Sequence, residues 1–292
     1  MLTVTLIRHG ESTDNVRHVW AGWADAPLSQ RGKAQAEALG AYLSQTPFTK
    51  IYASPLKRAA TTAGLVLAAQ PAPQPPYDFT VESIKEQNFG VAEGKSWCFP
   101  DHGTPKSLAE YMDEGKYPTP RPGECFTDGE SDEDLAARAM QAVDEVIMPH
   151  VRGAARAGRV EHIALVSHGI YIGALICALL KRDSRNVVPT HEYTGMQNTA
   201  WARVVITIQG VVDGTPIDLA DEDTPPLIVT ATDFGRADHL VTLKPNAGGT
   251  GKIAYDPKQQ DIRAFFSGAT KADATEHCES NALDEIDREV NN

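Results

Sequence analysis

Hydrophobic and polar positions alternate along the chain in a way that predicts strands and helices in turn. The first run, Leu-Thr-Val-Thr-Leu-Ile-Arg, is rich in aliphatic and β-branched residues, as in a buried strand, and Gly10 ends it. Ser29 can cap a helix in which apolar residues recur at helical spacing, and Ser54 can cap another, with Pro55 at its first helical position. The elements expected here are a strand over 2–8, a helix over about 30–45, a strand over 50–53 and a helix from residue 54 onward.

The same alternation returns in the second half of the chain. A helix is expected from Ser131 to about Val151, because an acidic first turn over 132–134 suits the positive end of the helix dipole. The further elements expected are a strand over 162–167, a helix over 170–180 and strands over 202–208 and 227–231, the last of them an antiparallel edge. Strands that alternate with helices form a mostly parallel sheet with helices on both faces. The predicted fold class is therefore α/β, a three-layer α/β/α arrangement.

Two stretches fall outside this alternation. Residues 71–130 hold many of the prolines and glycines and one predicted helix, near 107–113, and so long an excursion in a compact domain usually bears on function. We expect it to form the substrate pocket of a catalytic domain over 1–243. From Lys244 onward, a Gly-Gly-Thr-Gly run leads into a polar segment of mixed charge, so residues 244–292 are predicted to be a partly mobile C-terminal extension.

Composition narrows the function classes. The formal charge of −12 argues against nucleic acid as a partner, because binding to its phosphate backbone depends on a basic surface. No apolar run approaches the roughly 20 residues that span a bilayer, and the run over 1–7 is too short for a signal peptide, so a cytoplasmic protein without a membrane partner is expected. The four cysteines show no short repeated spacing, which predicts neither a disulfide framework nor a zinc site. The oligomeric state is not predicted.

Two histidines occupy the same structural context in the predicted sheet. Arg8 and His9 end the first strand, and His168 ends the strand over 162–167. Ligands of open parallel sheets bind beyond the carboxyl ends of the strands, so both imidazoles could face one pocket. Arg58 lies one turn into the helix that begins at Ser54, where the helix N-terminus favours an anion. Alone, each residue is more often structural, but together they predict a local phosphate site in an acidic protein.

Several motifs together resemble those of a known family. They are Arg8-His9-Gly10-Glu11-Ser12 with Asn15, Gly22-Trp23, Leu28-Ser29 with Gly32, Ser54-Pro55 with Arg58, Glu86 with Phe89-Gly90 and Glu93-Gly94, Gly129-Glu130-Ser131 with Arg138, and Ser167-His168-Gly169. Their order over about residues 2–209 is similar to that of the histidine phosphatase superfamily, in its phosphoglycerate-mutase-like branch. One such motif would be weak, whereas the ordered set is specific.

The resemblance implies a mechanism that the chemistry also supports. Neutral His9 would attack phosphorus and form a phosphohistidine, while Arg8, Arg58 and His168 favour its neutral state and hold the phosphoryl oxygens. Glu86 is favoured over Glu11 and Glu93 as proton donor to the leaving group and then as base for water. The resemblance also places Asn15 and Gly22 at the substrate, with Asn15 hydrogen-bonded to the phosphate. No metal and no other cofactor is expected.

Three functions share this set of residues. We favour a metal-independent phosphatase acting on small phosphomonoesters. Sugar phosphates are one candidate class of substrate, since the opening segment also resembles fructose-2,6-bisphosphatase-like members. A phosphoglycerate mutase is the first alternative, but mutases of this branch have an adjacent arginine pair and a lysine that grip the substrate carboxylate. The excursion offers only Lys95, Lys106, Lys116 and Arg121. A phosphate-binding regulatory protein without turnover is the second alternative, which the joint presence of nucleophile and acid disfavours.

Overall fold

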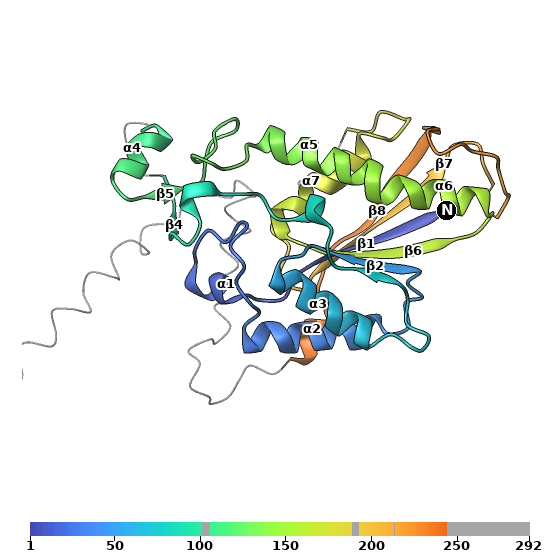
Figure 1. Ribbon diagram of the computed structural model, residues 1–292, viewed down its shortest axis with the longest axis horizontal. Coiled ribbons are helices and arrows are strands. Elements are labelled where there is room, and N and C mark those ends of the chain that lie inside the picture. Colours follow the sequence, from blue (N-terminus) through green and yellow to red (C-terminus); the bar gives the residue numbers. More distant parts are fainter. Residues whose placement is uncertain (101–105, 189–192, 213, 244–292) are drawn as a thin grey trace, which may run out of the picture. The chain divides into compact units, whose positions relative to one another are not determined.

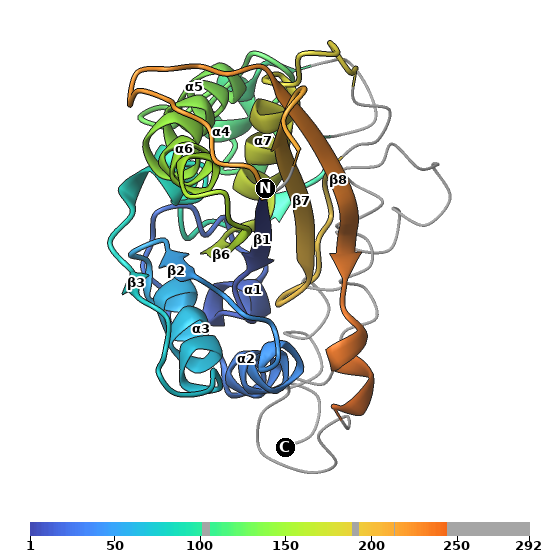
Figure 2. The same ribbon diagram turned by 90° about the vertical axis from the view of Figure 1, so that its right-hand side faces the viewer.

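The computed structural model describes residues 1–100, 106–188, 193–212 and 214–243. Their centre is a six-stranded sheet with the order β3-β2-β6-β1-β7-β8 (Figure 1 and Figure 2). The strands are β1 (Leu2–Arg8), β2 (Lys50–Ala53), β3 (Tyr77–Asp78), β6 (Glu161–Ser167), β7 (Trp201–Ile208) and β8 (Leu227–Arg236). Neighbours among the first four are parallel, whereas β7 is antiparallel to β1 and β8 is antiparallel to β7.

Helices cover both faces of this sheet. The helices of the described residues are α1 (Thr13–Arg17), α2 (Gln30–Leu43), α3 (Lys57–Ala68), α4 (Leu108–Asp113), α5 (Asp132–Ala142), α6 (Met148–Arg156) and α7 (Gly169–Leu180), with 3-10 turns η1 (Glu82–Ile84), η2 (Gly90–Ala92) and η4 (Asp238–Thr242) and a π-helical turn η3 (Val143–Ile147). Figure 2 shows α2 and α3 on one face and α5, α6 and α7 on the other. The predicted three-layer α/β fold, with a mostly parallel sheet, is confirmed.

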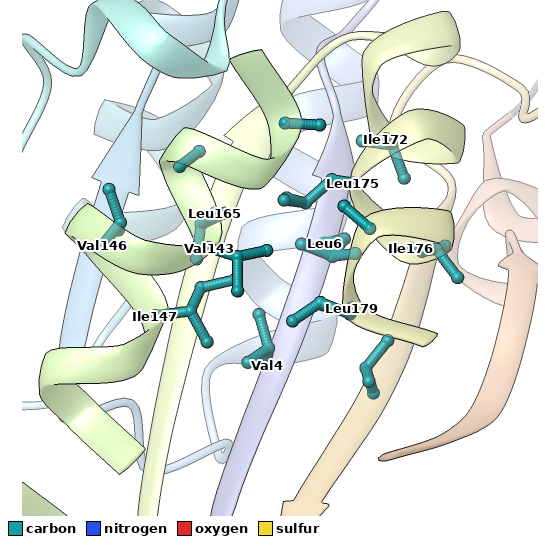
Figure 3. Packing of buried hydrophobic residues seen from close by; sticks show 14 of the residues in the cluster. Val4, Leu6, Val143, Val146, Ile147, Leu165, Ile172, Leu175, Ile176 and Leu179 are labelled. Atoms are coloured by element: carbon teal, nitrogen blue, oxygen red, sulfur yellow. The ribbon is translucent and has the colours of Figure 1, made fainter. Parts of the chain in front are cut away.

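The core follows from the alternation of side chains along the central strands. Val4 and Leu6 of β1 are fully buried beside η3 and α7 (Figure 3), whereas Ile7 points to the opposite face and packs with Leu39 of α2. Each large side chain buried in this way contributes about 1.5–3 kcal/mol of hydrophobic stabilisation. The first strand is thereby fixed in the middle of the sheet, and its end presents Arg8 and His9.

The excursion folds over its own apolar cluster. Trp20, Phe89 and Phe126 are buried together, and the two-residue strands β4 (Trp97–Cys98) and β5 (Tyr117–Pro118) pair in parallel beside them. The helix predicted near 107–113 is α4, whose N-cap Ser107 accepts a hydrogen bond from the Glu110 amide. This stretch therefore has a defined structure in the part that is described.

The strand over 201–208, whose direction was not predicted, is antiparallel, because it pairs with β1 in reverse direction. Two local predictions need correction. The expected helix over 131–151 is interrupted by η3, since Pro149 has no N–H to continue the regular ladder. Ser54 does not cap α3, which starts at Lys57 with Leu56 as N-cap, and the Ser54 hydroxyl is bound elsewhere.

The described residues all lie in a unit that comprises Met1–Asp256, and a second unit, Pro257–Asn292, lies outside them. The predicted extension over 244–292 is likewise outside the described residues. Among the helices that are described, none has the length and apolar character needed to cross a membrane. The cytoplasmic location stays a prediction.

Candidate active site

The parallel pairing of β1 with β6 brings the two strand-end histidines together. Arg8 lies opposite Ser167 in the register, and the His9 amide donates to the Ser167 carbonyl at 3.0 Å. The next residue of each strand is a histidine, and the ring centroids of His9 and His168 are 5.0 Å apart at an interplanar angle of 58°. Both rings are buried, at 4% and 0% exposure. The convergence expected from the sequence is thus present.

The His9 ring is oriented by the residue that follows it. Its Nδ1 lies 2.7 Å from the Gly10 carbonyl oxygen, which can only accept, so Nδ1 carries the proton and Nε2 keeps a lone pair. Burial lowers the pKa of His9 well below its ordinary value of 6.5, and the charges of Arg58 and Arg8 lower it further. The ring is therefore neutral at physiological pH, with Nε2 available as a nucleophile.

His168 is held by a different partner. Its Nε2 lies 2.9 Å from the Ser54 hydroxyl oxygen, while its Nδ1 is buried without a hydrogen-bond partner among the residues that are described. Burial lowers the pKa of His168 well below 6.5, and Arg58, His9 and Arg8 add to the shift. A phosphoryl oxygen would supply the missing partner for Nδ1.

Two arginines supply positive charge beside the two neutral rings. Arg58, 1% exposed, donates to the carbonyls of Gly22 at 2.6 Å and Ala24 at 2.7 Å, and Arg8 donates to the Met196 carbonyl. The Nε of each arginine is buried with no partner in the described part of the chain. Burial lowers the pKa of Arg8 to about 10, partly offset by Glu86. Such half-satisfied guanidinium groups can bind a tetrahedral anion.

Glu86 lies in this same electrostatic environment, because its charge acts on both Arg8 and Arg58. One carboxylate oxygen accepts the amides of Gln87 and Tyr171, each at 3.0 Å, and the other accepts the Ile170 amide at 3.4 Å. The first turn of α7 thus fixes the side chain next to His168. The arrangement leaves room on the second oxygen for a further hydrogen bond.

The two alternatives to Glu86 accept hydrogen bonds from groups that hold the structure together. Glu11 accepts the Ser29 hydroxyl at 2.5 Å, and Glu93 accepts the Trp23 amide at 2.7 Å with the same oxygen that faces the Phe89 amide at 3.2 Å. No hydrogen bond or ion pair from either carboxylate to an arginine is present among the described contacts, although Glu93 acts on Arg58 through its charge. The geometry therefore favours Glu86.

The two residues assigned to substrate binding by resemblance have clear structural roles. Gly22 has φ +45°, and a Cβ there would lie 2.1 Å from the Glu93 Oε1, so glycine lets the chain turn while its carbonyl binds Arg58. The Asn15 side-chain oxygen accepts from the Ser12 amide and from the Asn198 amide group, both at 3.1 Å. Their contacts with substrate stay predictions.

Asn198 and Thr199, which were not predicted to have a role in the site, hold the main chain at Arg8 and His9. The Thr199 amide donates to the carbonyls of Arg8 and His9 at 3.1 and 3.2 Å, and Asn198 Nδ2 donates to the His9 carbonyl at 3.2 Å. Most of these bonds use main-chain atoms, which leave no signature in residue identity. The Ser54 hydroxyl was assigned to helix capping and instead binds His168. No group of three or more possible metal ligands occurs in the described residues.

Comparisons with known proteins agree with this geometry. The family model for the histidine phosphatase superfamily (branch 1) matches residues 4–212. The chain is 29% identical, over 180 residues, to 2,3-bisphosphoglycerate-dependent phosphoglycerate mutase 2 of Gloeobacter violaceus, covering 61% of this chain and 76% of that protein. It is 33% identical, over 121 residues, to the adenosylcobalamin/alpha-ribazole phosphatase of Salmonella typhimurium, covering 41% of this chain and 58% of that protein.

Solved structures give the same fold. A mycobacterial glucosyl-3-phosphoglycerate phosphatase in complex with VO3 has a TM-score of 0.56 at 21% identity, covering 80% of this chain and 98% of that chain. The similar proteins thus include both mutases and phosphatases.

Proposed function

We propose, from the premise that this chain belongs to the histidine phosphatase superfamily (branch 1) and is an enzyme of that superfamily, that it hydrolyses small phosphomonoesters through a phosphohistidine on His9. The observation that carries the proposal is the meeting of His9 and His168, 5.0 Å apart, among Arg8, Arg58 and Glu86. A nucleophile, cations for the phosphoryl oxygens and a carboxylate are the groups that this reaction needs.

The reaction proceeds in two displacements. Nε2 of His9 forms a bond to phosphorus while the bond from phosphorus to the leaving oxygen breaks, and Glu86 gives that oxygen a proton. Water then attacks the phosphohistidine, Glu86 takes the proton from the water, and the phosphorus–nitrogen bond breaks. Arg8, Arg58 and His168 stabilise the charge on the non-bridging oxygens in both steps.

The contacts of the lysines and the arginine in the excursion favour hydrolysis over mutase activity. Lys106 and Lys116 both pair with Glu114, at 2.5 and 3.5 Å, and Arg121 donates to the Lys106 carbonyl at 3.3 Å. Side chains engaged with one another in this way are poorly placed to grip a substrate carboxylate. The sequence over 95–128 contains no adjacent arginine pair. Water, rather than a second phosphoglycerate, is therefore the proposed acceptor.

The test measures phosphate release by the full chain. A generic aryl phosphate and a panel of phosphorylated metabolites, sugar phosphates included, are offered to the wild type, to His9→Asn and to a control, His18→Asn. His18 is exposed with φ +53°, a conformation that asparagine tolerates. We expect activity, and trapping of an acid-labile phosphoprotein, in the wild type and the control only. Turnover by His9→Asn would contradict the proposal.

A second assay distinguishes the mutase. 3-Phosphoglycerate is supplied with and without a bisphosphate primer, and phosphate release is compared with isomerisation. Primed isomerisation faster than release would show a mutase instead.

A further inference from the structure

Thr199 has an unusual backbone for a β-branched residue. Its φ is +59°, and the residue is completely buried beside the carboxyl end of β1. A branched side chain is strained in this region, so surrounding bonds must hold it there. In this conformation the main-chain N–H of Thr199 donates to the carbonyls of both Arg8 and His9, at 3.1 and 3.2 Å.

The bond that holds the Thr199 side chain comes from far along the chain. The Thr199 hydroxyl donates its single proton to the Asn198 carbonyl at 2.7 Å. His239 Nε2 lies 2.9 Å from the same hydroxyl oxygen and must therefore be the donor in that contact. One hydrogen bond to the Thr199 side chain and others from its main-chain amide thus link His239 to the main chain of the proposed nucleophile.

His239 is built into the structure rather than placed on its surface. It belongs to η4, is 4% exposed, and its ring centroid is 5.9 Å from that of Tyr42 on α2. Burial lowers its pKa to about 4, so the ring is neutral at physiological pH. The family match ends at residue 212, and His239 follows β8, which lies beyond that match. A segment that follows the matched residues therefore contacts Thr199, which holds the main chain at His9.

We infer that His239 is a positioning residue for His9, which it acts on through Thr199, and this inference rests on the proposed function. In-line attack needs the reacting atoms within a few tenths of an ångström of the productive geometry, and a displacement of about 1 Å can lower a rate about a hundredfold. The carbonyls of Arg8 and His9 are anchored at Thr199, so loss of the His239 bond loosens one anchor of the peptide that carries the nucleophile, which Ser167 and Asn198 also hold. Arg58 is anchored separately at Gly22 and Ala24. Phosphate binding should thus be affected less than turnover.

The experiment compares His239→Leu, which removes the donor, with His239→Gln, whose amide can replace Nε2–H. Leu240→Ala, also in η4, is the control for lost packing. In His239→Leu we expect kcat to fall about tenfold to a hundredfold, with KM changing less than about threefold. His239→Gln should recover most of kcat, and Leu240→Ala should keep it. Thr199→Val should resemble His239→Leu, and the double variant should lose little more than either single variant.

A second readout does not depend on turnover. Amide hydrogen exchange at Thr199 should be faster in His239→Leu than in the wild type and in Leu240→Ala. Equal exchange and an unchanged kcat in His239→Leu would overturn the inference while the proposed function stands. If the wild type releases no phosphate, the proposed function fails. The exchange rates alone then decide whether His239 holds Thr199, and through it the main chain at His9, in place.

Discussion

Replacing Glu86 with glutamine separates its proposed proton transfer from its hydrogen bonds. Glutamine keeps an oxygen that can accept the amides of Gln87 and Tyr171, both 3.0 Å from the same carboxylate oxygen. Its amide nitrogen cannot accept the Ile170 N–H, now at 3.4 Å. Glutamine loses this long contact and also the carboxylate charge that acts on Arg8 and Arg58. We therefore expect the free energy of unfolding to fall by about 1–3 kcal/mol, less than the roughly 5–15 kcal/mol that holds a typical domain folded.

The effect on activity should depend on the leaving group. A positioned general acid contributes about 10²–10⁴ in rate, equivalent to about 2.7–5.4 kcal/mol. An alkyl phosphate releases a basic alkoxide and should show this loss in kcat/KM, which reports the steps up to leaving-group departure. An aryl phosphate with an acidic phenol departs without a proton, so its kcat/KM should fall less than about tenfold. Initial rates with the two substrates measure the ratio.

Glu93→Gln is the matched control. Its Oε1 accepts from Trp23 and Phe89, and glutamine preserves both bonds, so the ratio of the two kcat/KM values should match that of the wild type. Equal losses for alkyl and aryl phosphates in Glu86→Gln would refute the assignment of the proton donor. A changed ratio in Glu93→Gln alone would transfer that role to Glu93.

Two further predictions concern the charges around His9. Arg58→Met should lower phosphate release about 10²–10³-fold and weaken inhibition by vanadate. Arg17→Met, at an exposed arginine, should change neither. Retained vanadate affinity in Arg58→Met would contradict the anion site. His9 and His168 stay neutral when folded but take protons near pH 6.5 when unfolded, so stability should fall as the pH drops below 6.5, by about 1.4 kcal/mol per pH unit for each ring. Urea unfolding from pH 7 to 5 should show a shallower fall in His9→Asn, and an equal slope would refute the shift.

The sequence allowed the layers of the fold to be predicted because the central strands are fully buried. β1 has apolar residues at 2, 4, 6 and 7, and β6 has an apolar run over 163–166, as in strands covered by helices on both faces. Each strand is also followed directly by a histidine, so a common edge could be expected. What the residues could not indicate is that β1 and β6 are direct neighbours with Arg8 opposite Ser167. That register depends on the packing of the whole sheet.

The less predictable features depend on main-chain geometry or on competition for one group. Ser54 has the residue type and the following proline of an N-cap, but its hydroxyl binds His168 and the helix begins later. The Thr199 amide binds two carbonyls, and no side-chain pattern indicates such bonds. The interruption at η3 could have been expected from Pro149, since a proline cannot continue a helical ladder.

The site also indicates how an acidic chain could bind a phosphate ester, as the proposed function requires. Surface charges act on an anion through solvent, where salt screens them beyond about 8–10 Å, whereas the charges of Arg8 and Arg58 lie largely in the interior and are screened far less. Burial also leaves the Nε of each arginine and the Nδ1 of the neutral His168 without partners within the described residues. A phosphate that supplies those partners would bind despite the charge of −12. The two guanidinium charges also help to keep His9 neutral in the free enzyme, so substrate affinity and nucleophilicity arise from the same buried charges.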